Sequence, residues 1–157
     1  MKLKQSIHIF SLALIAILFL SGCSKSDESA QLDADIRLIE DYIASNNLNA
    51  VPTGSGLYIV TDYLGNGKSP NSNSTITIRY KGYRLDGFVF EDTGNSPATF
   101  NLGSLMQGWR EGLPYFKEGG RGTLLIPSGL AYGSNSPSPD IPANSVLLFD
   151  IELIAVY

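Results

Sequence analysis

One stretch of the chain constrains its fold more than any other. Between residues 75 and 85 (TITIRYKGYRL), apolar and polar side chains alternate, with the isoleucines and Tyr80 on one face. This period of two predicts a β-strand that is buried on one side only. The Asp86-Gly87 pair that follows is a hairpin turn signal, so we expect the return strand at residues 88–91. This part of the chain therefore predicts antiparallel pairing with one face against a core.

The remainder of the chain after residue 56 continues this pattern. Further strands are predicted at residues 57–64, 98–102, 122–126 and 146–156. Residues 105–116 have helical periodicity, but glycines and a proline limit the helix to two or three turns. No helix of crossover length separates most of the strands, which favours antiparallel pairing. We therefore predict an α+β domain at 51–157, with five or six strands and one short helix.

An amphipathic helix is predicted before this domain, within residues 32–50. Its apolar residues recur at helical spacing, and its acidic residues, Asp35 among them, lie mostly on other sides of the helix; the apolar stripe comprises Leu32, Ile36, Ile39 and Ile43. The stripe could pack on its own chain, the interpretation we favour, or pair with a second copy. Residues 51–56 (VPTGSG) are rich in turn formers and predict a joint that would make this helix separable from the domain.

The first 22 residues have the features of a secretory signal peptide. Lys2 and Lys4 precede an apolar run at residues 7–20, which is shorter than the roughly 20 residues that span a membrane. The run ends in Leu20-Ser21-Gly22-Cys23, which resembles the bacterial lipobox. This resemblance implies lipidation of Cys23, a polar tether at 23–31, and a lipid-anchored protein of the Gram-negative cell envelope. We expect the outer membrane, on its periplasmic side or at the cell surface; the alternative is ordinary cleavage beside an incidental cysteine.

The scarce residue types exclude several classes of chemistry. The chain has one histidine, His8, and one cysteine, Cys23. Once the leader is removed and Cys23 is modified, neither imidazole nor thiol remains. Catalytic triads, cysteine nucleophiles, His/Cys zinc sites and disulfides are then excluded, and we expect no cofactor or metal. The formal net charge of −4 argues against nucleic acid as a partner.

Several ordered segments resemble those of the FKBP family, the macrolide-binding peptidyl-prolyl cis/trans isomerases. They are residues 78–82 (IRYKG), 86–91 (DGFVFE), 100–103 (FNLG), 107–113 (QGWREGL), 130–133 (LAYG), 141–144 (IPAN) and 148–153 (LFDIEL). The resemblance covers about residues 57–157. It implies a strongly curved antiparallel sheet wrapped around one short helix. It also implies isomerisation of proline-containing, unfolded or partly folded exported proteins.

The resemblance also implies the site. Trp109 would form the floor under the proline ring, and the Tyr132 hydroxyl would face a substrate carbonyl. Ile141 would cover the ring, and the backbone N–H of Met106 would be a second donor. The walls would be Tyr80, Phe90, Phe100, Leu105, Met106 and Phe149.

Three positions depart from the family pattern. Asp140, before Ile141, stands where apolar residues are common. Glu91 stands where aspartate is usual, and its extra methylene could shift or break a hydrogen bond to Tyr80. Ala98 stands where an aromatic residue is usual and opens one side of the pocket. These departures weigh against macrolide binding more than against isomerase activity. They also leave open a catalytically weak, chaperone-like module that binds peptides or proteins. A third hypothesis, a glycan-binding domain with exposed aromatics, lacks a tandem aromatic platform.

Overall fold

The computed structural model describes residues 23–157, with side chains from residue 27 onward. Residues 31–157 form one compact unit, separate from the residues before them. The expected signal peptide, 1–22, lies outside the described residues. Helix α2 (Cys23–Ser45) begins nine residues earlier than the stripe predicts, so the backbone of the expected tether is helical. Residues 24–31 contain neither glycine nor proline, and helix formers such as Glu28 and Ala30 extend the helix in this direction.

Seven strands form one antiparallel sheet in the order β1-β2-β6-β7-β3-β4, and β5 pairs with β3. The fold class predicted from the sequence is confirmed, with one strand more than expected. The outer edge of β3 is shared: β5 pairs with its first half and β4 with its second half. The strands are β1 (Ala50–Pro52), β2 (Tyr58–Tyr63), β3 (Thr75–Arg84), β4 (Val89–Asp92), β5 (Ala98–Asn101), β6 (Arg121–Ile126) and β7 (Leu147–Val156).

Strand β1 lies in the segment that the sequence predicts as a joint. Val51 pairs with Ile59 of β2, so this segment is part of the sheet. The turn behind it is also bound to the domain, because the hydroxyls of Thr53 and Ser55 donate to Glu111 Oε1, at 2.6 and 2.5 Å. The segment is therefore an edge of the domain and not a loose connection.

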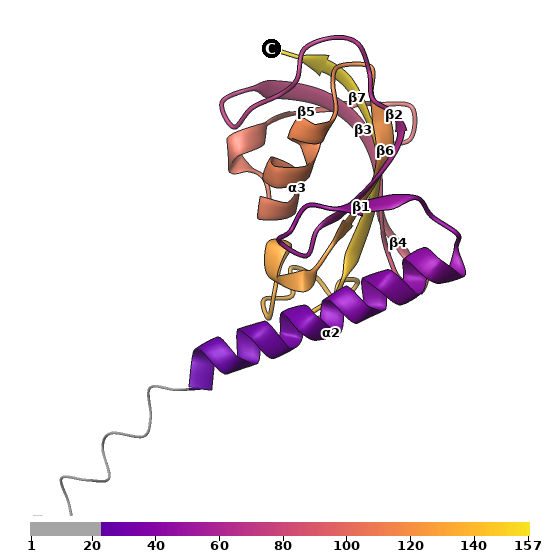
Figure 1. Ribbon diagram of the computed structural model, residues 1–157. Helices are drawn as coiled ribbons and strands as arrows, with labels where there is room; N and C mark the ends of the chain where they lie inside the picture. The colour runs from indigo at the N-terminus through magenta and orange to yellow at the C-terminus, as the bar shows by residue number, and fades with distance from the viewer. Residues whose placement is uncertain (1–22) are drawn as a thin grey trace, which may run out of the picture. The chain divides into compact units, whose positions relative to one another are not determined.

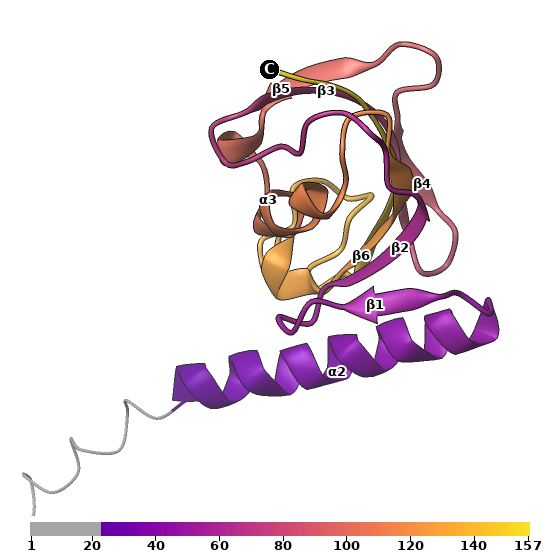
Figure 2. The ribbon, with the colours of Figure 1, turned by 45° about the horizontal axis from the view of Figure 1, so that its top comes forward.

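The concave face of the sheet holds the short helix α3 (Gln107–Gly112). Figure 2 shows the strands curving around α3, as the family resemblance implies. Three 3₁₀ turns accompany it: η1 (Leu102–Ser104), η2 (Leu113–Tyr115) and η3 (Ser128–Leu130). Gly108 lets α3 approach β6 closely, because a Cβ at this position would lie 2.5 Å from Ile126 Cγ2. A glycine that weakens the helical pattern in the sequence is thus required by the packing.

Helix α2 covers part of the other face of the sheet. Ile39 is fully buried in a cluster with Leu125, Val146 and Leu148, and α2 lies along the β1 side of the sheet in Figure 1. The apolar stripe therefore packs on its own chain, as we favoured, but the helix shares a core with the domain. Asp35 is also fully buried; it lies at the edge of the stripe, three residues after Leu32 and four before Ile39. None of the helices between residues 23 and 157 combines the length and apolar character that crossing a membrane requires.

Candidate functional site

Trp109 lies at the centre of an aromatic cluster on the concave side of the sheet. Its ring is edge-on to those of Tyr80, Phe149 and Phe100, with centroid distances of 5.0, 5.2 and 6.4 Å and interplanar angles of 86–87°. Such T-shaped pairs contribute about 0.5–1.5 kcal/mol each beyond their buried area. Trp109 is 3% exposed, and its buried indole N–H has no partner among the described residues. The cluster therefore fixes the indole on three sides and leaves it a free donor.

The other expected wall residues come from separate elements and meet this cluster. Phe90 of β4 packs edge-on against Phe149 at 5.7 Å. Leu105 and Met106, from the turn before α3, are half-buried against the same core, and Ile141 of the long loop is buried in it. The Met106 carbonyl accepts hydrogen bonds from the N–H groups of Trp109 and Arg110 and so fixes the start of α3. The structure thus brings together all the apolar side chains that the resemblance implies.

Gly82 is a residue of this site that the list of wall side chains missed. It lies on the inner side of β3 opposite Phe149. A Cβ here would lie 2.6 Å from the Phe90 ring and 2.8 Å from the Phe149 ring. Both distances are shorter than real Cβ contacts, so only glycine lets these two rings meet over β3. Its place in the IRYKG segment is the sequence signal that could have identified it.

Glu91 supplies the one carboxylate of the expected site, and this carboxylate accepts a hydrogen bond from a neighbouring phenol. The hydroxyl of Tyr80 donates to Glu91 Oε1 at 2.6 Å. The extra methylene of Glu91, which could have broken this hydrogen bond, does not do so. Burial first, and then the hydrogen bond and charge of Glu91, raise the pKa of Tyr80 well above its ordinary value. Tyr80 therefore stays protonated and keeps donating at neutral pH.

Tyr132 lies at the rim of the cluster and is 37% exposed. Partial burial and then the Glu91 charge raise its pKa as well, so its hydroxyl is a donor at neutral pH. Close to this rim, the guanidinium of Arg84 donates to the backbone carbonyl of Asp140 at 2.9 Å and lies 4.6 Å from the centroid of the Phe88 ring. Arg84 thereby ties the β3–β4 hairpin to the loop that carries Ile141, a contact that the sequence did not reveal.

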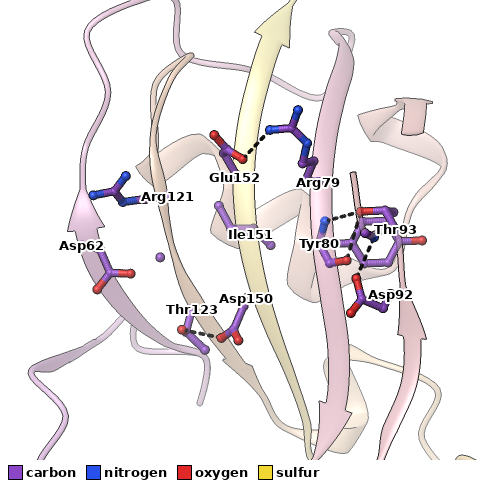
Figure 3. Close-up of a pocket in the computed structure, with 12 residues that line it drawn as sticks. Asp62, Arg79, Tyr80, Asp92, Thr93, Arg121, Thr123, Asp150, Ile151 and Glu152 are labelled. Atoms are coloured by element: carbon purple, nitrogen blue, oxygen red, sulfur yellow. Dashed lines mark hydrogen bonds and ion pairs between the residues drawn. The ribbon is translucent and has the colours of Figure 1, made fainter. Parts of the chain in front are cut away.

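A hollow of about 450 Å³ lies on the opposite face of the sheet. Figure 3 shows its charged and polar side chains projecting from β2, β6, β7 and β3. Opposite charges alternate across the strands here: Arg79 is paired with Glu152 at 2.9 Å, and Lys81 with Asp150 at 3.5 Å. Tyr80 of β3 is among the residues that line this hollow, but Trp109, Phe100 and Phe149 are not. We therefore assign it no part in the site.

The site offers apolar surface and neutral hydrogen-bond donors. In the part of the chain that the structure describes, no three His, Cys, Asp or Glu side chains gather as metal ligands would. A cluster of this composition suits contact with an apolar ring flanked by amide carbonyls. It can select the shape of a bound peptide and change the polarity around it, and it provides no activated nucleophile among these residues.

The curved antiparallel sheet, its single short helix and the aromatic cluster between them define an α+β domain with an apolar, aromatic core on its concave side. The sequence profile described as "FKBP-type peptidyl-prolyl cis-trans isomerase" matches residues 66–154. The chain belongs to this family. The match includes the aromatic residues around Trp109 and Tyr132.

Known relatives agree with this assignment. Over 107 residues the chain is 44% identical to the FKBP-type isomerase FkpA of Buchnera aphidicola from Schizaphis graminum, covering 66% of this chain and 42% of the relative. A crystal structure of a Pseudomonas syringae peptidyl-prolyl cis-trans isomerase matches with a TM-score of 0.72 and 30% identity, covering 82% of this chain and 94% of that one. The crystal structure of Escherichia coli FkpA matches with a TM-score of 0.69 and 32% identity, covering 99% of this chain and 74% of that one. The chain spans less than half the length of the Buchnera relative.

Proposed function

We propose that the chain is a peptidyl-prolyl cis/trans isomerase that assists the folding of exported proteins at the cell envelope. The observation that carries the proposal is the ring of aromatic side chains around Trp109, within the segment that matches the family. Its substrates would be proline-containing segments of unfolded or partly folded proteins. The site needs no cofactor for this reaction.

The physics of prolyl isomerisation fits a site of this composition. Rotation about an X–Pro bond is slow because resonance gives the C–N bond partial double-bond character. The twisted transition state is less charge-separated than the planar amide, so a dry apolar pocket favours it relative to water. Shortening the time of isomerisation from tens of seconds to milliseconds requires the activation free energy to fall by about 5–6 kcal/mol. Shape, desolvation and a few hydrogen bonds can supply this without breaking a bond in the substrate.

Each residue then has a defined role. Trp109 is the floor for the proline ring, and Ile141 covers it from the long loop. The walls are Tyr80, Phe90, Phe100, Leu105, Met106 and Phe149. The Tyr132 hydroxyl and the Met106 N–H donate to substrate carbonyls, and Glu91 holds Tyr80 in place through their hydrogen bond.

A prolyl-peptide assay on protein lacking residues 1–22 tests this proposal. Isomerisation of a short Ala-Pro or Leu-Pro peptide is followed by protease coupling and by NMR exchange, which needs no protease. We expect activity in the wild type and a loss of at least tenfold in Trp109→Leu, since this change removes the floor of the pocket. Phe116→Leu is the matched control: Phe116 is fully buried in the same core but is not one of the rings around Trp109. Equal losses in both variants would mean that general core damage, not the site, explains the result.

The alternative is a catalytically weak FKBP-like lipoprotein that binds peptides or proteins in a chaperone-like role. Ala98, half-buried against the core where an aromatic residue is usual in the family, favours this alternative. The same peptide separates the two functions, because binding without acceleration of exchange would support the alternative. Titration with a macrolide tests a second class of ligand. We expect weak binding, because Glu91 and Ala98 depart from the family pattern.

The envelope location rests on the sequence around Cys23. We propose that Cys23 is lipidated after removal of residues 1–22 and that the lipid holds the protein at the outer membrane, on the periplasmic side or at the cell surface. More than one acyl chain on a single residue gives stable anchoring, at about 0.8 kcal/mol per buried CH₂. Cys23→Ser in the full-length chain should move the protein to the aqueous phase on detergent partitioning, or leave it unprocessed. Identical aqueous behaviour of the wild type would contradict the anchor.

A further inference from the structure

The N-terminal helix places a buried carboxylate at the base of the long loop. Asp35 of α2 is fully buried. Its Oδ2 accepts hydrogen bonds from the backbone N–H and the hydroxyl of Ser128, at 2.7 and 2.6 Å. Its Oδ1 accepts a third, from the side-chain amide of Gln31 at 2.7 Å. These three donors offset the cost of burying the charge.

Ser128 in turn holds the backbone on both sides of Tyr132. Its carbonyl accepts from the N–H of Ala131 at 2.9 Å and from that of Gly133 at 2.8 Å. The Gly133 carbonyl accepts from Asn144 N at 2.7 Å, which closes the far side of the loop. A continuous series of hydrogen bonds therefore runs from Asp35 through Ser128 to the residues that flank Tyr132.

Stability alone does not account for a carboxylate at this position. A buried charge with its partners is often no more stabilising than apolar residues of similar size. Its hydrogen bonds, however, have direction, and they fix where Ser128 lies. The position of the Tyr132 hydroxyl matters in the proposed reaction, because misplacing a group by about 1 Å can cost up to a hundredfold in rate.

We propose that Asp35 is a positioning residue of the isomerase site, which acts through Ser128 to hold Tyr132. This inference rests on the proposed function. The contact of α2 through Ile39 buries apolar surface against the sheet. The contact through Asp35 fixes Ser128 and so sets the geometry of the site. The N-terminal helix is thus part of the catalytic apparatus as well as a cover for the sheet.

A double-mutant cycle tests whether Asp35 acts through Tyr132. Asp35→Ala should lower kcat/KM roughly two- to tenfold, and no more than Tyr132→Phe does, since it acts through that hydroxyl. In the Tyr132→Phe background, Asp35→Ala should cost less than about twofold, because the group it positions is already gone. Asp35→Asn should restore most of the activity, since its amide oxygen can still accept from Ser128. Losses that multiply fully in the double variant would overturn the proposal.

A control variant on the same helix separates a positioning role of Asp35 from a loss of stability. Ile39→Val weakens the same helix contact without touching Ser128, so it should leave kcat/KM within about 1.5-fold at a similar loss of stability. Should Asp35→Ala not fold, Ser128→Ala takes its place in the cycle, because it removes only the hydroxyl. Equal activity losses in Ile39→Val and the Asp35 or Ser128 variant would contradict a positioning role.

Amide hydrogen exchange provides a readout that does not depend on turnover. In Asp35→Ala or Ser128→Ala, the amides of Ala131 and Gly133 should exchange at least tenfold faster, while the Leu153 amide, bonded to Gly120 at 2.8 Å, keeps its rate. An inactive wild type would overturn the proposed function, whereas unchanged exchange at Ala131 and Gly133 would overturn the role of Asp35.

Discussion

The Tyr80 hydroxyl and Glu91 Oε1 lie 2.6 Å apart and join β3 to β4 at the edge of the aromatic cluster. The carboxylate is therefore engaged by a protein donor on one of its oxygens before any substrate binds. If Glu91 only orients Tyr80, its charge is dispensable, because a neutral amide oxygen can accept the same hydrogen bond. If its charge stabilises the transition state, the neutral replacement should fail.

Glu91→Gln separates these two roles. We expect kcat/KM to fall by less than about threefold, since pocket shape and dryness persist and a neutral hydrogen bond is worth about 0.5–1.5 kcal/mol. Asp92→Asn is the matched control, because Asp92 is exposed like Glu91 but accepts instead from the N–H of Gly94 at 2.7 Å. A loss of a hundredfold or more, roughly 2.7 kcal/mol, with the fold intact would show that Glu91 acts electrostatically.

Tyr132→Phe removes one hydroxyl and leaves the ring. The loss of a single neutral donor should lower kcat/KM by roughly two- to tenfold, measured with the prolyl-peptide assay. Tyr115→Phe is the control, since Tyr115 is 51% exposed on the turn after α3 and should have no effect. An unchanged rate in Tyr132→Phe would remove this hydroxyl from the mechanism.

Activity should be nearly independent of pH between about 6 and 9. Residues 23–157 contain no histidine, and free carboxylic acids titrate near pH 4. Burial raises the pKa of both Tyr80 and Tyr132 above the ordinary value near 10, so both phenols remain donors over this range. A bell-shaped profile of kcat/KM, as an acid–base pair gives, would contradict the desolvation mechanism.

The same shifts predict how stability depends on alkaline pH. Burial, followed by its partner Asp150, raises the pKa of Tyr83, and burial raises that of Tyr80. The folded protein therefore holds these protons more tightly than the unfolded chain does. The free energy of unfolding should be constant below about pH 10 and should fall as the pH rises beyond it, because only the unfolded phenols ionise there. Urea unfolding at pH 8, 9, 10 and 11 measures this trend, and a midpoint that rises above pH 10 would contradict it.

Gly82→Ala tests the close approach of the two phenylalanine rings. The new methyl group would push apart Phe90 and Phe149, which should destabilise the protein by about 1–3 kcal/mol and lower activity on prolyl peptides. Gly129→Ala is the control, since a Cβ at that position meets nothing within 4 Å. Unchanged activity in Gly82→Ala, with unchanged stability, would mean that the rings can separate freely.

Local patterns in the sequence account for much of the fold. The alternation in β3 gives its buried face, with Ile78 and Tyr80 inside, because a period of two is an intrinsic property of a half-buried strand. Strand β1 was not predictable in this way: it has three residues, and its pairing with β2 decides its conformation. The family segments supplied the members of the cluster around Trp109. They could not show the Asp35–Ser128 contact, which joins residues 93 positions apart and depends on where the long loop lies against α2.

Ile39→Ala measures how strongly helix α2 is joined to the domain. Ile39 is fully buried against Leu125 and Leu148, so the cavity should lower the free energy of unfolding by about 2–5 kcal/mol. Leu38→Ala on the same helix is the control, because Leu38 is 49% exposed and should cost less than about 0.5 kcal/mol. A chain that begins at Thr53 would leave Leu125, Val146 and Leu148 uncovered. We therefore expect it to unfold at lower urea concentration or to aggregate, as circular dichroism and gel filtration would show. An unfolding midpoint equal to that of the longer protein would show that the helix is separable, as the turn formers at residues 51–56 had suggested.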